Sequence, residues 1–286
     1  MLMSVDIYPI AGANEPNRDN LKELDSTVVI NSRYYWALEA IGDFSRQNKV
    51  PFWLFMLSNQ HTTYGKNEKT NEIKVGASYP YPTVGILRLQ AMTAIAYGIQ
   101  GLIFWTYEMV DNNKMIEGTN HLREEYFNAP YMNGKTTEIW EYCKSVIPEI
   151  KLVGKILLNA DFQGARQVYR SEITDEKDMI PETKKFESQY GCIIDVKIKG
   201  SDPGVVITHL TKGSKNYMAI VSRSFKKSQS IHIKIDSSYK WHEIELDPNS
   251  ENAGLPKEKI VSDERMELYG RSSTLSPGGM FLFEYE

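Results

Sequence analysis

The sequence predicts two segments of different fold class, an α/β segment over residues 1–158 and an all-β segment over residues 159–286. In the first segment, uninterrupted apolar stretches at 52–57 and 101–107 indicate strands covered on both faces. Helical patterns separate these stretches, which is typical of parallel βαβ units. After about residue 160, short strand patterns split by turn residues replace this rhythm. They indicate antiparallel sheets packed as a β-sandwich.

The first segment begins with a predicted strand over residues 3–10, which should end at Pro9 because proline has no N–H to donate. Apolar side chains at helical spacing predict a helix over residues 32–47, and the apolar strand at 52–57 follows it. Residues 58–82 are rich in Asn, Lys, Gly and Tyr, so we expect a long loop there.

A second helix is predicted over residues 83–96, where Thr83 can cap the first turn. The chain then enters the strand at 101–107. A last amphipathic helix over about residues 136–158 closes the segment, and Pro148 should kink it.

The second segment shows eight short strand patterns. In one of them, Ile231, Ile233 and Ile235 alternate with polar residues, which predicts one buried face and one wet face. The patterns cover residues 165–170, 192–200, 204–210, 216–223, 230–236, 241–246, 265–270 and 279–286.

Charge and motif content exclude several classes of function. With 33 basic and 37 acidic residues the net charge is −4, so the chain has no overall positive field and we expect no nucleic-acid partner. Cys143 and Cys192 have no further Cys or His at metal-ligand spacing, so we expect buried thiols and no metal site. No apolar run reaches the ~20 residues that span a bilayer. We therefore expect no membrane span. No cofactor-binding motif occurs either, so we expect no cofactor.

Four stretches in this order carry a family resemblance: SVDIYPI, NKVPFWLFMLS, TVGILRLQAMTAIAYGIQGLIFWTY and LSPGGMFLFEY. Together they resemble the C-terminal part of bacterial glycoside-hydrolase-like proteins of the GH42-like kind. The resemblance implies the last three βα units of a TIM-type (β/α) barrel followed by a C-terminal β-sandwich. It also implies carbohydrate as the partner and a site at the carboxyl ends of the barrel strands.

Two carboxylates are the candidate catalytic residues. Asp6 closes the first strand, and Glu108 adjoins the end of the strand at 101–107. Glycoside hydrolysis needs two carboxyl groups flanking the bond, and these are the strand-end pair that the chain offers. The alternatives are a structural hydrogen-bonding role for Asp6 and a solvated loop position for Glu108.

Five residues at the same strand ends are candidate substrate contacts. Tyr8 lies two residues after Asp6 and should point the same way. Trp105 and Tyr107 could stack on the apolar face of a sugar ring, although Trp105 could equally be core. The polar candidates, Gln60 and His61, follow the strand at 52–57, and His61 could instead be a solvated loop residue.

In the superfamily the acid/base glutamate stands on a middle strand, which would lie upstream of Met1. No acidic residue lies between Phe52 and Lys66, where the nucleophile is usual. We therefore expect a fragment that acts on or binds carbohydrate; the alternatives are a non-catalytic carbohydrate-binding module and an inactive structural remnant.

Three strands cannot close a barrel, so their exposed edges should be covered by the β segment or by a second copy of the chain in a homo-oligomer. The N-terminus has no signal-peptide pattern, and the cellular compartment stays open.

Overall fold

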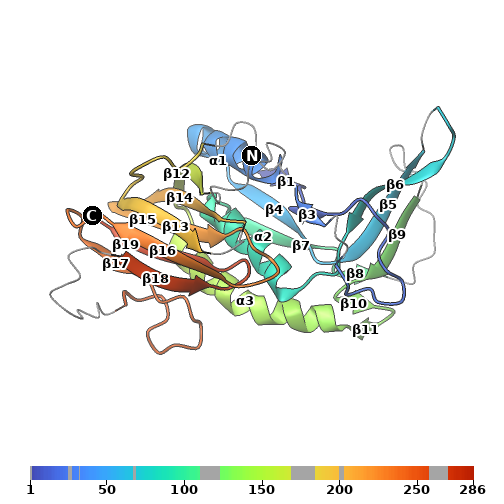
Figure 1. The fold of residues 1–286 in the computed structure, drawn as a ribbon. Coiled ribbons are helices and arrows are strands. Elements are labelled where there is room, and N and C mark those ends of the chain that lie inside the picture. The colour runs from blue at the N-terminus through green and yellow to red at the C-terminus, as the bar shows by residue number, and fades with distance from the viewer. Residues whose placement is uncertain are drawn as a thin grey trace.

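Figure 1 shows the computed structural model, which describes residues 2–24, 28–31, 33–66, 69–109, 123–168, 184–199, 203–257 and 270–286. Over these ranges the chain has the mixed, sheet-rich α/β character expected from the sequence. The all-β segment lies at one end of the molecule, and a small antiparallel sheet lies at the other end (Figure 1). None of the described helices is both long and apolar enough to cross a membrane.

A three-stranded parallel sheet forms the centre of the first segment. It consists of β1 (Met3–Val5), β4 (Phe52–Leu57) and β7 (Gly101–Trp105), in the order β1-β4-β7. The predicted parallel βαβ arrangement is confirmed, and the three strands form an open sheet. The strand predicted over residues 3–10 is shorter than expected, because β2 (Ile10–Ala11) leaves the sheet and pairs antiparallel with β3 (Val29–Ile30).

Three helices were predicted close to their observed bounds: α1 (Arg33–Asn48), α2 (Val84–Ala96) and α3 (Glu138–Leu157). The Thr83 hydroxyl accepts the Ile86 N–H at 3.3 Å, so the predicted cap of α2 is confirmed. In α2 every residue except Val84 and Arg88 is buried, which makes it the central helix of the first segment. Pro148 lies inside α3, and the helix continues through it.

The helices cover only one face of the parallel sheet. On that face, Phe52 and Leu54 pack in one apolar cluster with Tyr34, while Met56 packs with α2 and α3. The opposite face carries Trp53, Phe55, Ile103 and Trp105, and we call these four residues the open face.

Burial of the open face is incomplete, since Trp53 is 39% exposed and Trp105 is 44% exposed. Phe55 and Ile103 are only partly buried. The expectation that these strands are covered on both faces is therefore wrong for the described residues, because no described helix packs on this side.

The prediction of a long loop over residues 58–82 is wrong. This stretch forms β5 (Gln60–Lys66) and β6 (Ile73–Tyr79), and β5 also pairs with β9 (Arg123–Asn128) in the antiparallel order β6-β5-β9. The pattern was missed because β5 is polar, although its threonines and tyrosine suit a strand. A further small sheet, β11-β10-β8, joins β8 (Glu108–Met109), β10 (Tyr131–Met132) and β11 (Lys135–Thr136).

Two antiparallel sheets form the second segment, in the orders β12-β14-β15-β19-β17 and β13-β16-β18. Both contribute to one apolar cluster, in which Ile207 and Ile220 from the first sheet meet Ile231 and Ile233 from the second. The predicted alternation around Ile231 is thus confirmed. The strands are β12 (Asp161–Val168), β13 (Ile193–Lys199), β14 (Val205–Lys212), β15 (Lys215–Ser222), β16 (Gln229–Ile235), β17 (Trp241–Glu243), β18 (Gly270–Leu275) and β19 (Met280–Tyr285).

Two predicted strands of this segment need comment. The strand predicted over 241–246 ends at Glu243, after which Ile244 makes only an isolated bridge. The strand predicted over 265–270 lies outside the described residues except for Gly270.

One apolar cluster crosses the expected boundary between residues 158 and 159. It joins Leu54 and Ile95 of the first segment to Val206 and Leu282 of the second. Phe162, the second residue of β12, is 2% exposed and packs its ring 5.0 Å from that of Tyr97 at the end of α2. The two segments therefore share core.

Phe162→Ala should destabilise both segments together, by about 3–5 kcal/mol, because it opens a cavity in this shared core. Urea unfolding followed by far-UV circular dichroism and by tryptophan fluorescence should give one shifted transition with both probes. Ile73→Ala, at a side chain that is 64% exposed, is the control and should change stability by less than about 0.5 kcal/mol. Two separate transitions, with only one of them shifted, would contradict the shared core.

Candidate functional site

The candidate site is built where the three parallel strands end. Asp6 follows β1, Ser58 follows β4 and Thr106 follows β7, so all three lie along the same edge of the sheet. The sheet β6-β5-β9 lies beyond this carboxyl edge (Figure 1). The structure thus brings the ends of the three strands, and the residues that follow them, to one edge.

A buried glutamine of α2 fixes the end of β4. The Gln90 side chain, 1% exposed, accepts the Leu57 N–H at 2.8 Å and donates to the Leu57 carbonyl at 3.0 Å. On the other side, the Ser58 N–H donates to the Trp105 carbonyl at 2.7 Å. The backbone is therefore fully paired at the point where the chain leaves the parallel sheet for β5.

His61 lies between two tyrosine rings. In the antiparallel sheet it stands opposite Tyr79 on β6 and Tyr126 on β9. Its ring stacks on Tyr79 at 4.4 Å and on Tyr126 at 5.0 Å, measured between centroids. His61 is 5% exposed, and its Nδ1 lies 2.6 Å from the Asn59 Oδ1. The Tyr79 and Tyr126 rings thus cover the two faces of the imidazole. We call Tyr79, His61 and Tyr126 the row of rings, and His61 is its central member.

Asp6 and Tyr8 join the row at its Tyr79 end. The Tyr8 ring meets the Tyr79 ring edge-on, with the two centroids 5.4 Å apart. Burial raises the pKa of the Tyr8 hydroxyl above its usual value, and the Asp6 carboxylate raises it further. Asp6 itself is exposed at the mouth of the site.

Glu124 stands beside the same rings. The Tyr126 hydroxyl donates to the Glu124 Oε2 at 2.6 Å. Burial raises the pKa of Tyr79, and the negative charges of Asp6 and Glu124 both raise it further.

Trp105 and Tyr107 present exposed rings at the end of β7. Trp105 is 44% exposed and meets Phe55 edge-on at 5.8 Å, and the peptide bond between Trp105 and Thr106 is cis. Tyr107 is 48% exposed and stacks on Tyr131 at 6.4 Å with nearly parallel rings. These rings form the open aromatic part of the edge.

The remaining predicted residues lie apart from Asp6. Glu108 is exposed and belongs to β8, which pairs with β10 in a different sheet. Gln60 is 1% exposed; its amide donates to the Leu21 carbonyl at 2.9 Å and accepts from Asn128. The carboxylate that the structure places on the row of rings around His61 is Glu124, through the Tyr126 hydroxyl, and the sequence reasoning did not name it.

The sequence reasoning missed Tyr79, Glu124 and Tyr126 beside His61, because they stand on β6 and β9. Alternation along β9 does carry a signal, since it puts Glu124 and Tyr126 on one face and Glu125 on the other. Reading that signal requires the pairing with β5, which no local pattern shows.

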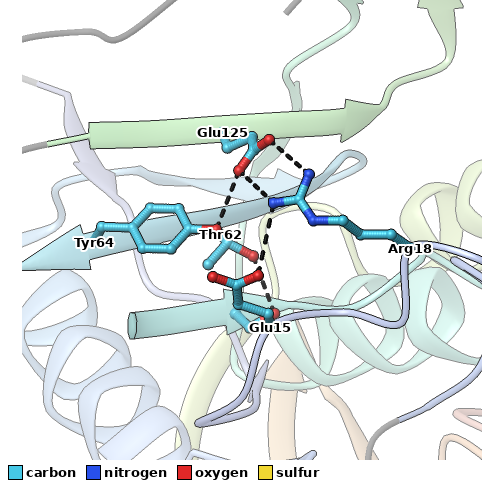
Figure 2. Close-up of polar contacts among 6 residues, drawn as sticks. Glu15, Arg18, Thr62, Tyr64 and Glu125 are labelled. Carbon is cyan, nitrogen blue, oxygen red and sulfur yellow. Dashed lines mark hydrogen bonds and ion pairs between the residues drawn. The ribbon is translucent and has the colours of Figure 1, made fainter. Parts of the chain in front are cut away.

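The opposite face of the sheet β6-β5-β9 is covered by the loop that follows β2. Arg18 of this loop forms two hydrogen bonds of 2.9 Å with the buried carboxylate of Glu125 (Figure 2). The Tyr64 hydroxyl donates to the same carboxylate at 3.1 Å, and Glu15 lies 3.6 Å from Arg18 (Figure 2). Burial, followed by the hydrogen bond to Glu125, raises the pKa of Tyr64 to about 12. This network fixes the loop against the back of the aromatic row.

A groove lies elsewhere, between α2, α3 and β17. It has a volume of about 300 Å³. Several of its charged groups have partners: Arg88 binds Glu149 through two contacts of 2.7 Å, and Lys257 lies 2.6 Å from Glu243. We place the candidate site at the strand ends and not in the groove, because the exposed rings of Trp105 and Tyr107 stand there.

The described side chains include no group of three or more His, Cys, Asp or Glu placed to hold a metal ion. What the edge offers chemically is aromatic faces, tyrosine hydroxyls and carboxylates. Comparison with known proteins finds no matching family and no significantly similar curated protein.

Gln90→Leu should destabilise the protein by about 2–5 kcal/mol, because two buried backbone groups of Leu57 lose their hydrogen-bond partners. Chemical denaturation measures the loss, and the near-UV circular dichroism of the tyrosines should change as the end of β4 shifts. Gln163→Leu, at an exposed side chain of β12, is the matched control. Wild-type stability in Gln90→Leu would refute the role assigned to this side chain.

Arg18→Ala should destabilise the protein by about 1–3 kcal/mol, since the Glu125 carboxylate stays buried while it loses its bidentate partner. Hydrogen exchange should rise in the loop of residues 12–24 and much less in β12. The control Arg33→Ala removes an exposed arginine of α1 and should leave both readouts unchanged. Unaltered exchange in the loop of Arg18→Ala would mean that the ion pair does not fix it.

Proposed function

We propose that this chain binds carbohydrate at the carboxyl edge of the sheet β1-β4-β7. The observation that carries the proposal is the pair of large rings at the end of β7, with Trp105 44% and Tyr107 48% exposed. Tryptophan and tyrosine rings stack on the apolar faces of sugars, and the exposed parts of these two rings are open to such a ligand. Asp6 and Tyr8 supply polar groups on the same edge, where sugar hydroxyls would need them.

The finer fold assignment belongs to the same proposal. An open parallel sheet with helices on one face and large side chains on the other is what part of a TIM-type barrel would look like. The open face would then line the barrel interior. Two antiparallel sheets that share one apolar cluster support a β-sandwich for the second segment. We thus propose a glycoside-hydrolase-like fold.

Binding without hydrolysis is the activity that we propose for this chain. Hydrolysis would require two carboxyl groups on either side of one glycosidic bond. Asp6 follows the parallel sheet, whereas Glu108 pairs in the sheet β11-β10-β8. Separate sheets hold the two groups, which favours a binding site over a catalytic one.

Removal of the exposed rings tests this function. Trp105→Ala and Tyr107→Ala should each weaken oligosaccharide binding about tenfold, because stacking on a sugar contributes on the order of 1 kcal/mol. A glycan array identifies a ligand and isothermal titration calorimetry measures its affinity. Trp36→Ala, at a ring that is 42% exposed on α1, is the matched control and should bind normally. If the wild-type chain binds no glycan, the proposed function is wrong.

The absence of hydrolysis is tested on the same glycans and on a panel of aryl glycosides. We expect no product from the wild-type chain. Turnover that disappears in Asp6→Asn or Glu108→Gln would instead establish a hydrolase that uses these carboxylates.

A further inference from the structure

The two sheets of the second segment differ in what covers them. The sheet that contains β14 and β19 lies in the middle, because its side chains pack in two directions. Val206 and Leu282 enter the cluster shared with the first segment, whereas Ile207 and Phe283 enter the cluster between the two sheets. The sheet β13-β16-β18 covers only the far side of that second cluster. Its inner face is therefore apolar, and its other face points away from both clusters.

Alternation along β16 shows which side chains stand on this outer face. Ile231 and Ile233 pack in the cluster between the sheets, so Ser230, His232 and Lys234 point outward. All three are half-buried. A long lysine side chain in such a position packs its stem along the sheet and keeps its ammonium group at the surface.

The neighbouring strand β13 adds two lysines. Val196 packs in the inner cluster, so Lys197 and Lys199 point outward. The register places Lys197 opposite His232 and Lys199 opposite Ser230. Both lysines are exposed, and the Lys197 side chain is 72% exposed. Basic side chains from two paired strands thus share one surface.

Positive charge outweighs negative charge there. Within β13 and β16 one acidic side chain points outward, Asp195, which stands opposite Lys234 and lies 3.5 Å from Lys197. Among the described residues, Lys199 and Lys234 form no ion pair. The exposed turn that leads into β16 adds two further lysines. We call this surface the basic sheet face; its charged residues are Lys197, Lys199, Lys226, Lys227, His232 and Lys234.

The spacing of the charges suits an extended anionic chain. At roughly 3.3–3.4 Å per residue, Lys197 and Lys199 stand about 7 Å apart, and Lys234 stands about 13 Å further along the sheet than Lys199. Several ammonium groups on one open surface create a local positive potential that a single small anion would not balance. A linear partner with repeated negative charges is complementary to it.

The other groups on this face favour a sugar chain as that partner. Ser230 and Thr274 stand opposite each other in the register and can hydrogen-bond to sugar hydroxyls. The strands β13, β16 and β18 contain no Phe, Tyr or Trp, so they offer no stacking platform of the kind that single-stranded nucleic acids use. A sheet face also lacks the helix or two-stranded ribbon that enters a DNA groove.

We propose that the basic sheet face binds an acidic polysaccharide, a linear sugar chain that carries carboxylates on successive rings. Its lysines contact the carboxylates, and the hydroxyls between them contact the sugar. This surface belongs to the second segment and is separate from the strand ends of the sheet β1-β4-β7. The inference therefore goes beyond the proposed function and does not depend on it.

Matched ligands test the need for charge. Oligogalacturonate and its methyl ester share length and linkage and differ in the charge of the carboxyl group; oligomannuronate is a second acidic probe. Calorimetry at neutral pH and low salt should show an acidic oligomer binding at least about tenfold more tightly than the ester. Added salt should remove this preference, because exposed charges are screened.

Charge-removing variants assign the binding to the basic sheet face. The double variant Lys197→Gln with Lys199→Gln should weaken binding of the acidic oligomer at least about tenfold, since two ammonium contacts are lost. The matched control is Lys151→Gln with Lys155→Gln, which removes two exposed lysines of α3 and the same net charge. It should bind like the wild type. Unfolding curves of both variants identify any loss that comes from misfolding.

The remaining outcomes would overturn the inference. They are no binding of either acidic oligomer, equal affinity for acid and ester, and an equal loss in the α3 control. A single-stranded oligonucleotide of the same charge that binds as tightly as oligogalacturonate would make the surface a nucleic-acid site instead. Acid binding that is lost in Trp105→Ala but kept in the Lys197 and Lys199 variant would place the acid at the end of β7, which leaves the proposed function standing.

Discussion

The end of β4 is the constraint on which the rest of the candidate site depends. A parallel strand that runs past its neighbour leaves N–H and C=O groups that must find other partners when they are buried. Past the end of β1, Gln90 of α2 supplies both partners for Leu57 in one planar amide. The strand can therefore stop at that residue without an energetic penalty, and the chain can turn into β5. The position of β5, and of His61 on it, therefore depends on the contact between Gln90 and Leu57.

The sheet β6-β5-β9 is held by polar contacts more than by an apolar core. Residues 58–63 are all buried and all polar. Such a network adds little net stability per hydrogen bond, but it permits one geometry because each buried group needs its partner. Arg18 and Glu125 complete it on one face, and the stacked rings around His61 complete it on the other. The contacts on the two faces thus fix the sheet on which the row of rings around His61 stands.

Elements with strong apolar periodicity could be predicted from the sequence, because burial decides both their type and their orientation. The strands at 52–57 and 101–107, the capped helix after Thr83 and the alternation around Ile231 are examples. The strand β5 could not, since its first residues are polar and are buried by hydrogen bonding rather than by transfer of apolar surface. Glu124 was missed for a related reason: its place in the site is set by a partner strand about 60 residues away in the chain.

The acidic residues of this fold differ in how their charge is paired. In the groove between α2, α3 and β17, Glu149 and Glu243 each have a cation at 2.6–2.7 Å, so the folded chain itself balances the charge. Glu125 is likewise balanced by Arg18. Glu124 differs, because it accepts the Tyr126 hydroxyl at 2.6 Å, and a neutral hydroxyl orients a carboxylate but leaves its charge in place.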